Sequence, residues 1–178
     1  MNSEVQNNVS QDFLVAIKAA VKAGLEIMRV YENGDFHVEL KDDDSPVTLA
    51  DKSANDIINN YLQPTGIPII SEENEEIAFS ERKKWNKCWI VDPLDGTKEF
   101  IKKSGEFTVN IALVENNLPV FGVIYIPVSK ELYYGDVKEE KSFKILINNK
   151  NEIKGLIDKA QEISPGFVEK TINVAGSR

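Results

Sequence analysis

Four stretches rich in β-branched and aromatic residues follow one another in the second half of the sequence, separated by short connections. They span residues 107–114, 120–128, 131–134 and 143–147. Connections this short join neighbouring antiparallel strands, whereas a parallel pair needs a crossover of about a dozen residues or more. The sequence therefore predicts an antiparallel sheet in this half of the chain.

Two helical patterns precede the sheet. In the first, apolar side chains recur at helical spacing from Phe13 to Met28, and Ser10 is placed to cap the start. The second pattern begins near Thr48 and carries an apolar stripe as far as Tyr61. Two helices followed by an antiparallel sheet predict an α+β fold in which the helices pack on the sheet as a layer.

The end of the sequence has a different character. Residues 148–166 are polar and irregular, as in a linker, and residues 171–175 begin to resemble another strand. We therefore expect a domain over residues 1–150, followed in residues 151–178 by a linker and the start of a second domain.

The charge balance argues against several classes of partner. The 178 residues include 29 acidic and 21 basic side chains, which gives a net charge of −8. Such a surface repels nucleic acids and anionic membranes, and it also repels phosphorylated substrates unless bound cations reverse the local field. The N-terminus has no signal pattern and no apolar run is long enough to span a membrane. We expect a cytoplasmic protein with no integral membrane segment.

Carboxylates follow two apolar runs at the points where the predicted strands end. Residues 67–70 lead into Glu72, and residues 89–91 lead into Asp92 and Asp95. Mg²⁺ prefers oxygen ligands in near-octahedral geometry, with water and phosphate oxygens completing its shell. The candidate ligands for such an ion are Glu72, Asp92, Asp95 and the Leu94 carbonyl.

The residues after Asp95 are suited to a phosphate group. Gly96 permits close approach of the backbone, and a short helix beginning at Thr97 places the Gly96 and Thr97 amides toward a phosphate. Lys98 is a candidate to neutralise a second phosphate, or it serves only to keep an acidic surface soluble. Asp-Pro-x-Asp-Gly is also common turn chemistry, and paired glutamates are usually solvated. Their joint occurrence at two strand ends favours a phosphate enzyme.

Asp51 has two interpretations. Thr48-Leu-Ala-Asp51 resembles a capping box, in which Asp51 acts only on the start of its own helix. A carboxylate there can also accept the proton of the Thr97 hydroxyl and so help to orient a nucleophilic water. The spacing alone does not separate the two.

Other polar residues favour structural interpretations. Residues 36–40 alternate apolar and polar side chains, as in a strand with one exposed face, and His37 lies on its polar side. Asp42, Asp43 and Asp44 are consecutive, so their side chains diverge and a solvated turn is expected. Cys88, the single cysteine, excludes an internal disulfide and is interpreted as a packed thiol.

The spacing of Asp51, Glu72-Glu73 and Asp92-Pro-Leu-Asp-Gly-Thr97 resembles the signature of the lithium-sensitive, Mg²⁺-dependent phosphatases related to inositol monophosphatase. Residues 45–51, 98–101 and 105–113 are similar to the bacterial 3'(2'),5'-bisphosphate nucleotidases within that family. Inositol monophosphatases usually carry Thr-Asn-Phe after the Gly-Thr, so Lys98-Glu99 argues against that branch. The resemblance extends from about residue 13 to residue 178.

The resemblance implies the N-terminal layered domain of the inositol monophosphatase-like sugar-phosphatase fold. It implies hydrolysis of the 3'-phosphate of adenosine 3',5'-bisphosphate, a by-product of sulfate assimilation, to AMP, with two or three Mg²⁺ ions and inhibition by Li⁺. It assigns the metals to Glu72, Asp92, Leu94 and Asp95. It assigns the substrate phosphate to Glu72, Leu94, Asp95, Gly96 and Thr97, and catalysis to Asp51, Thr97 and Glu72.

One departure from the family is large. The family's second α/β domain carries a Trp-Asp motif whose aspartate is a further metal ligand, but Trp85 and Trp89 are followed by Asn86 and Ile90. We therefore expect that domain to be absent, activity to be weakened, and the uncovered apolar face to promote dimerisation or other association. The alternatives are an inositol-phosphate or other sugar-phosphate phosphatase, and a non-catalytic metal-binding remnant or interaction domain.

Overall fold

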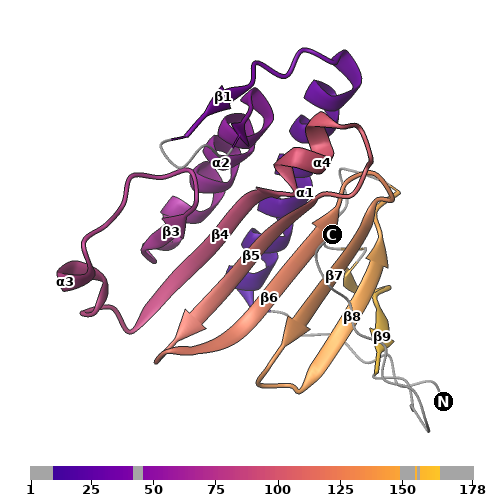
Figure 1. The fold of residues 1–178 in the computed structure, drawn as a ribbon. Coiled ribbons are helices and arrows are strands. Elements are labelled where there is room, and N and C mark those ends of the chain that lie inside the picture. The colour runs from indigo at the N-terminus through magenta and orange to yellow at the C-terminus, as the bar shows by residue number, and fades with distance from the viewer. Residues whose placement is uncertain (1–9, 42–45, 149–154, 156, 165–178) are drawn as a thin grey trace, which may run out of the picture.

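The computed structural model describes residues 10–41, 46–148, 155 and 157–164, and within them helices lie against one face of a sheet (Figure 1). The helices are α1 Gln11–Asn33, α2 Leu49–Leu62, α3 Phe79–Arg82 and α4 Thr97–Ile101, with a 3₁₀ turn at Gln63–Thr65. The strands are β1 Glu39–Leu40, β2 Pro46–Val47, β3 Ile69–Ser71, β4 Lys87–Asp95, β5 Thr108–Glu115, β6 Leu118–Ile126, β7 Glu131–Asp136, β8 Lys141–Leu146 and β9 Gln161–Ile163. The predicted α+β fold is confirmed.

The described strands from β3 to β9 form one sheet whose spatial order follows the chain. From β4 onward every neighbouring pair is antiparallel, which confirms the order predicted for β5 to β8. β3 and β4 are parallel, with Ile70 opposite Ile90, and the short helix α3 lies in the connection between them. Parallel strands end at the same edge of a sheet, so the residues that follow β3 lie beside the C-terminal part of β4.

α1 begins and ends where its sequence provides caps. The Phe13 amide donates to the Ser10 hydroxyl at 3.3 Å, so the predicted N-cap is confirmed. At the other end Gly34 adopts a positive φ of 77°, and its amide donates to the Val30 carbonyl at 3.0 Å. The helix packs on α2 and on the middle strands of the sheet, with which it encloses the core. No helix in the described part of the chain is long and apolar enough to cross a membrane.

The two faces of the sheet differ. Alternate residues, among them Trp89, Ile111 and Val123, are fully buried beneath α1 and α2. Their neighbours along the strands point to the opposite face because side chains alternate along a strand. On that face, Ile90 and Ile124 remain 46% and 47% exposed. We call this surface, defined by Ile90, Ile124 and Leu146, the outer face.

The predicted strand over residues 36–40 is mostly wrong. Only Glu39–Leu40 forms a strand, and of its predicted apolar side Phe36 packs against the core, while Val38 and Leu40 are 50% and 68% exposed. His37 has a φ of 44°, which breaks the extended backbone, and β1 pairs only with β2. His37 itself is exposed, as expected.

Near the end of the described chain, β9 lies within residues 148–166, which we expected to be irregular. It pairs with β8, and the nearby Ile157 is buried in the core. The predicted strand at 171–175 and the aspartates at 42–44 lie outside the described residues. The domain boundary at residue 150 stays a prediction.

Candidate active site

Asp51 at the start of α2 makes both of the contacts that the sequence left open. Its Oδ2 accepts a hydrogen bond from the Thr48 amide at 2.7 Å, which is part of the capping box at the start of α2, and a second from the Thr48 hydroxyl at 2.6 Å. Its Oδ1 accepts a hydrogen bond from the Thr97 hydroxyl at 2.9 Å. Asp51 is 2% exposed. One carboxylate therefore fixes the start of α2 and holds a hydroxyl from the other side of the site.

A β-bulge and a glycine shape the segment that carries the aspartates. The register between β4 and β5 shifts between Asp92 and Asp95, which redirects the end of β4. Gly96 then adopts a φ of 96° and caps α4, as predicted for a short helix from Thr97 to Ile101. A Cβ at Gly96 would lie 2.8 Å from the Glu106 carbonyl oxygen. Only glycine fits there without a shift of the backbone.

Glu72 is tied to β4 by its main chain. Its amide donates to the Val91 carbonyl at 3.2 Å, one residue before Asp92. The main chain of Glu72 therefore lies beside the strand that carries Asp92. The Glu72 side chain, however, accepts a hydrogen bond from Lys41 Nζ at 2.9 Å, and Lys41 also donates to Glu73 at 2.6 Å. Burial alone would lower the pKa of Lys41, but the hydrogen bonds and charges of Glu73 and Glu72 outweigh it and raise that pKa.

A partly buried network of hydrogen bonds holds the Glu72–Glu73 segment against α2. The Ser71 hydroxyl donates to Asn55 Oδ1 at 2.7 Å, and the Asn55 amide donates to Asn74 Oδ1 at 2.9 Å. Asn59 donates to the same Asn74 oxygen at 3.0 Å. Asn55 lies one helical turn after Asp51, so α2 positions both the Asp51–Thr97 pair and the loop that carries Glu72.

Asp92 shows the clearest sign of a missing partner. Its Oδ1 is buried and has no hydrogen-bond partner. Burial, with the charges of Glu72, Asp95 and Asp51, raises the pKa of Asp92 to about 7, against a smaller lowering by the Leu94 amide. A cation relieves both the lost solvation and the repulsion, so these residues fit a divalent metal in donor chemistry. Their side chains do not yet form a complete metal-binding group. Among the described residues no three acidic, histidine or cysteine side chains form such a group.

The remaining predicted residues lie around this point. Asp95 is exposed and accepts a hydrogen bond from the Asn110 amide on β5 at 3.1 Å. The Leu94 carbonyl is 3.3 Å from the Thr97 hydroxyl, while the Leu94 side chain is buried in the core. Lys98 is exposed on α4. The structure therefore brings the backbone of the predicted residues together, with Glu72 turned toward Lys41.

Comparison with known proteins agrees with this geometry. The family model described as the inositol monophosphatase family matches residues 8–162. The chain belongs to the inositol monophosphatase family. Its resemblance to that family, predicted from the sequence, is thereby confirmed, and its fold is that of the family's solved structures.

Within the family, the chain is similar to bacterial proteins named 3'(2'),5'-bisphosphate nucleotidase CysQ. It is 51% identical over 118 residues to the protein of Salmonella typhimurium, covering 65% of this chain and 48% of the relative. It is 46% identical over 144 residues to that of Buchnera aphidicola, covering 77% of this chain and 54% of the relative. The crystal structure of CysQ from Bacteroides thetaiotaomicron superposes with a TM-score of 0.77 at 40% identity, over 92% of this chain and 61% of that one. The chain thus spans about half the length of the curated relatives it matches.

Several residues that support the candidate site were not predicted from the sequence. Lys41, Asn55 and Asn74 carry no motif of their own. Asn110 gave a weak signal, as a polar residue in an otherwise apolar strand. These residues support the site through contacts between distant segments, and such contacts leave no local pattern.

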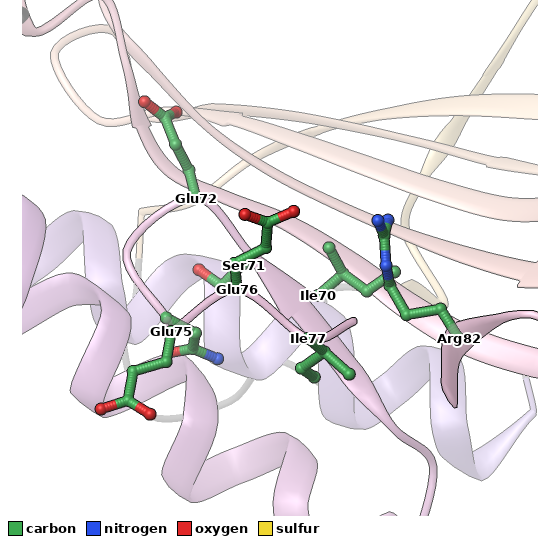
Figure 2. A pocket seen from close by; sticks show the side chains of 8 residues that line it. Ile70, Ser71, Glu72, Glu75, Glu76, Ile77 and Arg82 are labelled. Atoms are coloured by element: carbon green, nitrogen blue, oxygen red, sulfur yellow. The ribbon is translucent and has the colours of Figure 1, made fainter. Parts of the chain in front are cut away.

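A hollow adjoins Glu72 in the segment between β3 and α3. It has a volume of about 230 Å³ and is lined by Ile70, Ser71, Glu72, Asn74, Glu75, Glu76, Ile77 and Arg82. Figure 2 shows Glu72 at one side of this hollow and Arg82 at the other. Its volume lies below the roughly 300–1,000 Å³ usual for sites that enclose a whole small-molecule ligand. We interpret it as an acidic margin of the candidate site.

Proposed function

We propose that this chain forms the metal- and phosphate-binding part of a Mg²⁺-dependent phosphomonoesterase that releases the 3'-phosphate of adenosine 3',5'-bisphosphate to give AMP. The observation that carries the proposal is the buried, unpartnered Asp92 Oδ1. It lies on a strand whose following loop brings Thr97 within 2.9 Å of the Asp51 carboxylate. The similarity to proteins named bisphosphate nucleotidase supports this substrate.

Thr97 and Asp51 orient the nucleophile in this proposal. The Thr97 hydroxyl donates its single proton to Asp51 Oδ1, so its lone pairs face outward as acceptors. A water that donates to Thr97 Oγ1 turns its own lone pair toward a phosphorus atom. Because Asp51 is held by Thr48 at its other oxygen, this arrangement exists before substrate binds. Such preorganisation lowers the cost of reaching the transition state.

Asp92, Asp95, Glu72 and the Leu94 carbonyl are the proposed ligands of two or three Mg²⁺ ions. When bound, the metal supplies an activated water and stabilises the charge that develops on the leaving oxygen. Asn110 holds one Asp95 oxygen and leaves the other available. The Gly96–Thr97 turn is proposed to contact the substrate phosphate, and Lys98 a second phosphate. Inhibition by Li⁺ and a place in sulfur assimilation are part of the same proposal.

The test is phosphate release from adenosine 3',5'-bisphosphate and from inositol 1-phosphate, with and without Mg²⁺ and Li⁺. Asp92→Asn removes the charge of a proposed ligand while keeping its shape. Asp56→Asn is the matched control, because Asp56 is exposed on α2 and has no part in the proposed site. We expect Mg²⁺-dependent, Li⁺-sensitive release from the nucleotide, lost in Asp92→Asn and retained in Asp56→Asn.

Three other outcomes have different meanings. Faster release from inositol 1-phosphate would replace the substrate and keep the reaction. Release that is independent of Mg²⁺, or unaffected by Asp92→Asn, would overturn the proposed mechanism. Saturable Mg²⁺ binding without release from either substrate would make the chain a non-catalytic metal-binding domain.

A further inference from the structure

Lys41 joins two parts of the candidate site that are distant in sequence. Its ammonium lies 2.9 Å from Glu72 Oε1 and 2.6 Å from Glu73 Oε1. Thirty-one residues separate Lys41 from Glu72 along the chain. The Lys41 side chain is 24% exposed and that of Glu73 is 11% exposed, whereas that of Glu72 is 54% exposed. The contact with Glu73 is therefore both the shorter and the better shielded of the two.

The same Glu72 carboxylate is a proposed metal ligand. An ammonium group and a divalent cation on one carboxylate repel each other, and the repulsion is stronger in a partly buried site than in water. Asp92, one residue beyond the Val91 carbonyl that binds the Glu72 amide, has a buried oxygen without a partner. The protein therefore supplies a cationic partner to Glu72, whereas the buried Asp92 Oδ1 has no hydrogen-bond partner among the described residues.

We propose that Lys41 is a counter-cation that neutralises Glu72 and Glu73 in the metal-free protein. When Glu72 takes part in metal binding, Lys41 gives up its contact with Glu72 and keeps its contact with Glu73. The inference rests on the proposed function only in that Glu72 is a metal ligand. Two consequences follow. Lys41 competes with the metal, which weakens metal binding, and it stabilises the fold when no metal is present.

Lys41→Met tests both consequences, because methionine keeps most of the side-chain stem and removes the charge. We expect the Kd for Mg²⁺, and for Mn²⁺, to fall by roughly threefold to tenfold in isothermal titration calorimetry. In a chelator, the variant should melt at a lower temperature than the unmodified chain, and saturating Mg²⁺ should narrow that difference. Lys41→Arg keeps the positive charge and should therefore change the Kd less than Lys41→Met does.

Lys52→Met is the matched control. It removes one positive charge from an ion pair with Glu39 nearby, at a Nζ–Oε2 distance of 2.5 Å, without a contact to Glu72. A drop in Kd of the same size in this variant would show a general effect of net charge and would overturn the proposal. Unchanged or weaker Mg²⁺ binding by a folded Lys41→Met variant would overturn it as well.

A measurement on the unmodified chain guards against a variant that does not fold. The Nζ resonance of Lys41 should shift when Mg²⁺ saturates the protein, while that of Lys52 stays in place; an unmoved Lys41 resonance overturns the inference. Tighter binding by Lys41→Met without any phosphate release would keep this inference and overturn the proposed function. No saturable metal binding by the unmodified chain would overturn the inference and the metal part of the function together.

Discussion

The Thr97 hydroxyl and the Asp51 carboxylate meet at 2.9 Å, although 46 residues separate them in the sequence. The second oxygen of the same carboxylate accepts both the amide and the hydroxyl of Thr48. Because a helix cap and an active-site contact share one buried side chain, the position of Thr97 depends on the start of α2. The helix cap and the proposed orientation of a water thus both depend on the position of the Asp51 carboxylate.

Thr97 can be tested with two complementary variants. Thr97→Val keeps the shape and removes the hydroxyl, so we expect kcat to fall by about 10²-fold or more while KM changes little. Thr97→Ser keeps the hydroxyl and should retain activity within about tenfold of the original. Steady-state kinetics with adenosine 3',5'-bisphosphate provides the measurement. Equal activity in the two variants would exclude a role for the hydroxyl in orienting water.

Gly96 should be far more sensitive to alanine than Gly66, although both have positive φ. At Gly96, where φ is 96°, a Cβ would meet the Glu106 carbonyl oxygen at 2.8 Å, whereas at Gly66, where φ is 70°, nothing lies within 4 Å. We expect Gly96→Ala to lower the free energy of unfolding by about 2–4 kcal/mol, and Gly66→Ala by only about 1 kcal/mol. Urea denaturation measures both. Similar losses at the two sites would show that backbone conformation alone sets the cost.

The sequence was sufficient for the features that depend on local patterns. The periodicity from Phe13 to Met28 predicted α1 with its cap at Ser10, and short connections predicted the antiparallel order of β5 to β8. Carboxylates after the apolar runs 67–70 and 89–91 were also a local signal, although β4 continues through Asp92 to Asp95. Each of these predictions rests on neighbours within about ten residues.

Features set by distant contacts were not predicted. Alternation at residues 36–40 indicated a strand with a buried side, but burial requires a covering layer, and Val38 and Leu40 have none in the described structure. The same holds for Lys41, whose partners Glu72 and Glu73 come from another loop. The two possibilities for Asp51 remained open for this reason: Thr48 is three residues away, and Thr97 is brought close only by the fold.

The outer face should promote association between copies of the chain. Ile90, Ile124 and Leu146 are 46%, 47% and 50% exposed on the side of the sheet opposite α1 and α2. Ile124→Lys places a charge in the middle of this face, and we expect it to raise the monomer fraction in sedimentation velocity. Its effect on stability should stay within about 0.5 kcal/mol, as for most surface substitutions.

Val137→Lys is the control for this prediction, because Val137 is 57% exposed in the turn after β7 and lies outside the outer face. The same apolar-to-lysine change there should leave the association unchanged. A chain that is monomeric at every concentration tested, or that responds equally to both substitutions, would contradict association through the outer face.

Asp92 should make the metal-free protein less stable as the pH rises. Burial, together with Glu72, Asp95 and Asp51, raises the pKa of this carboxyl from 3.8 to about 7. Between these values the folded chain binds a proton that the unfolded chain has lost, so stability falls as the pH rises from about 4 to about 7. Allowing for solvent screening of a partly exposed group, we expect Asp92 to account for a loss of about 1–2 kcal/mol.

Thermal unfolding in a chelator across this range measures the loss. Asp92→Asn should flatten it, and saturating Mg²⁺ should reverse its sign, because metal binding favours the ionised carboxylate. A stability that rises with pH in the chelator, in the unmodified chain and in Asp92→Asn alike, would show that other groups dominate and that Asp92 is ionised without a metal.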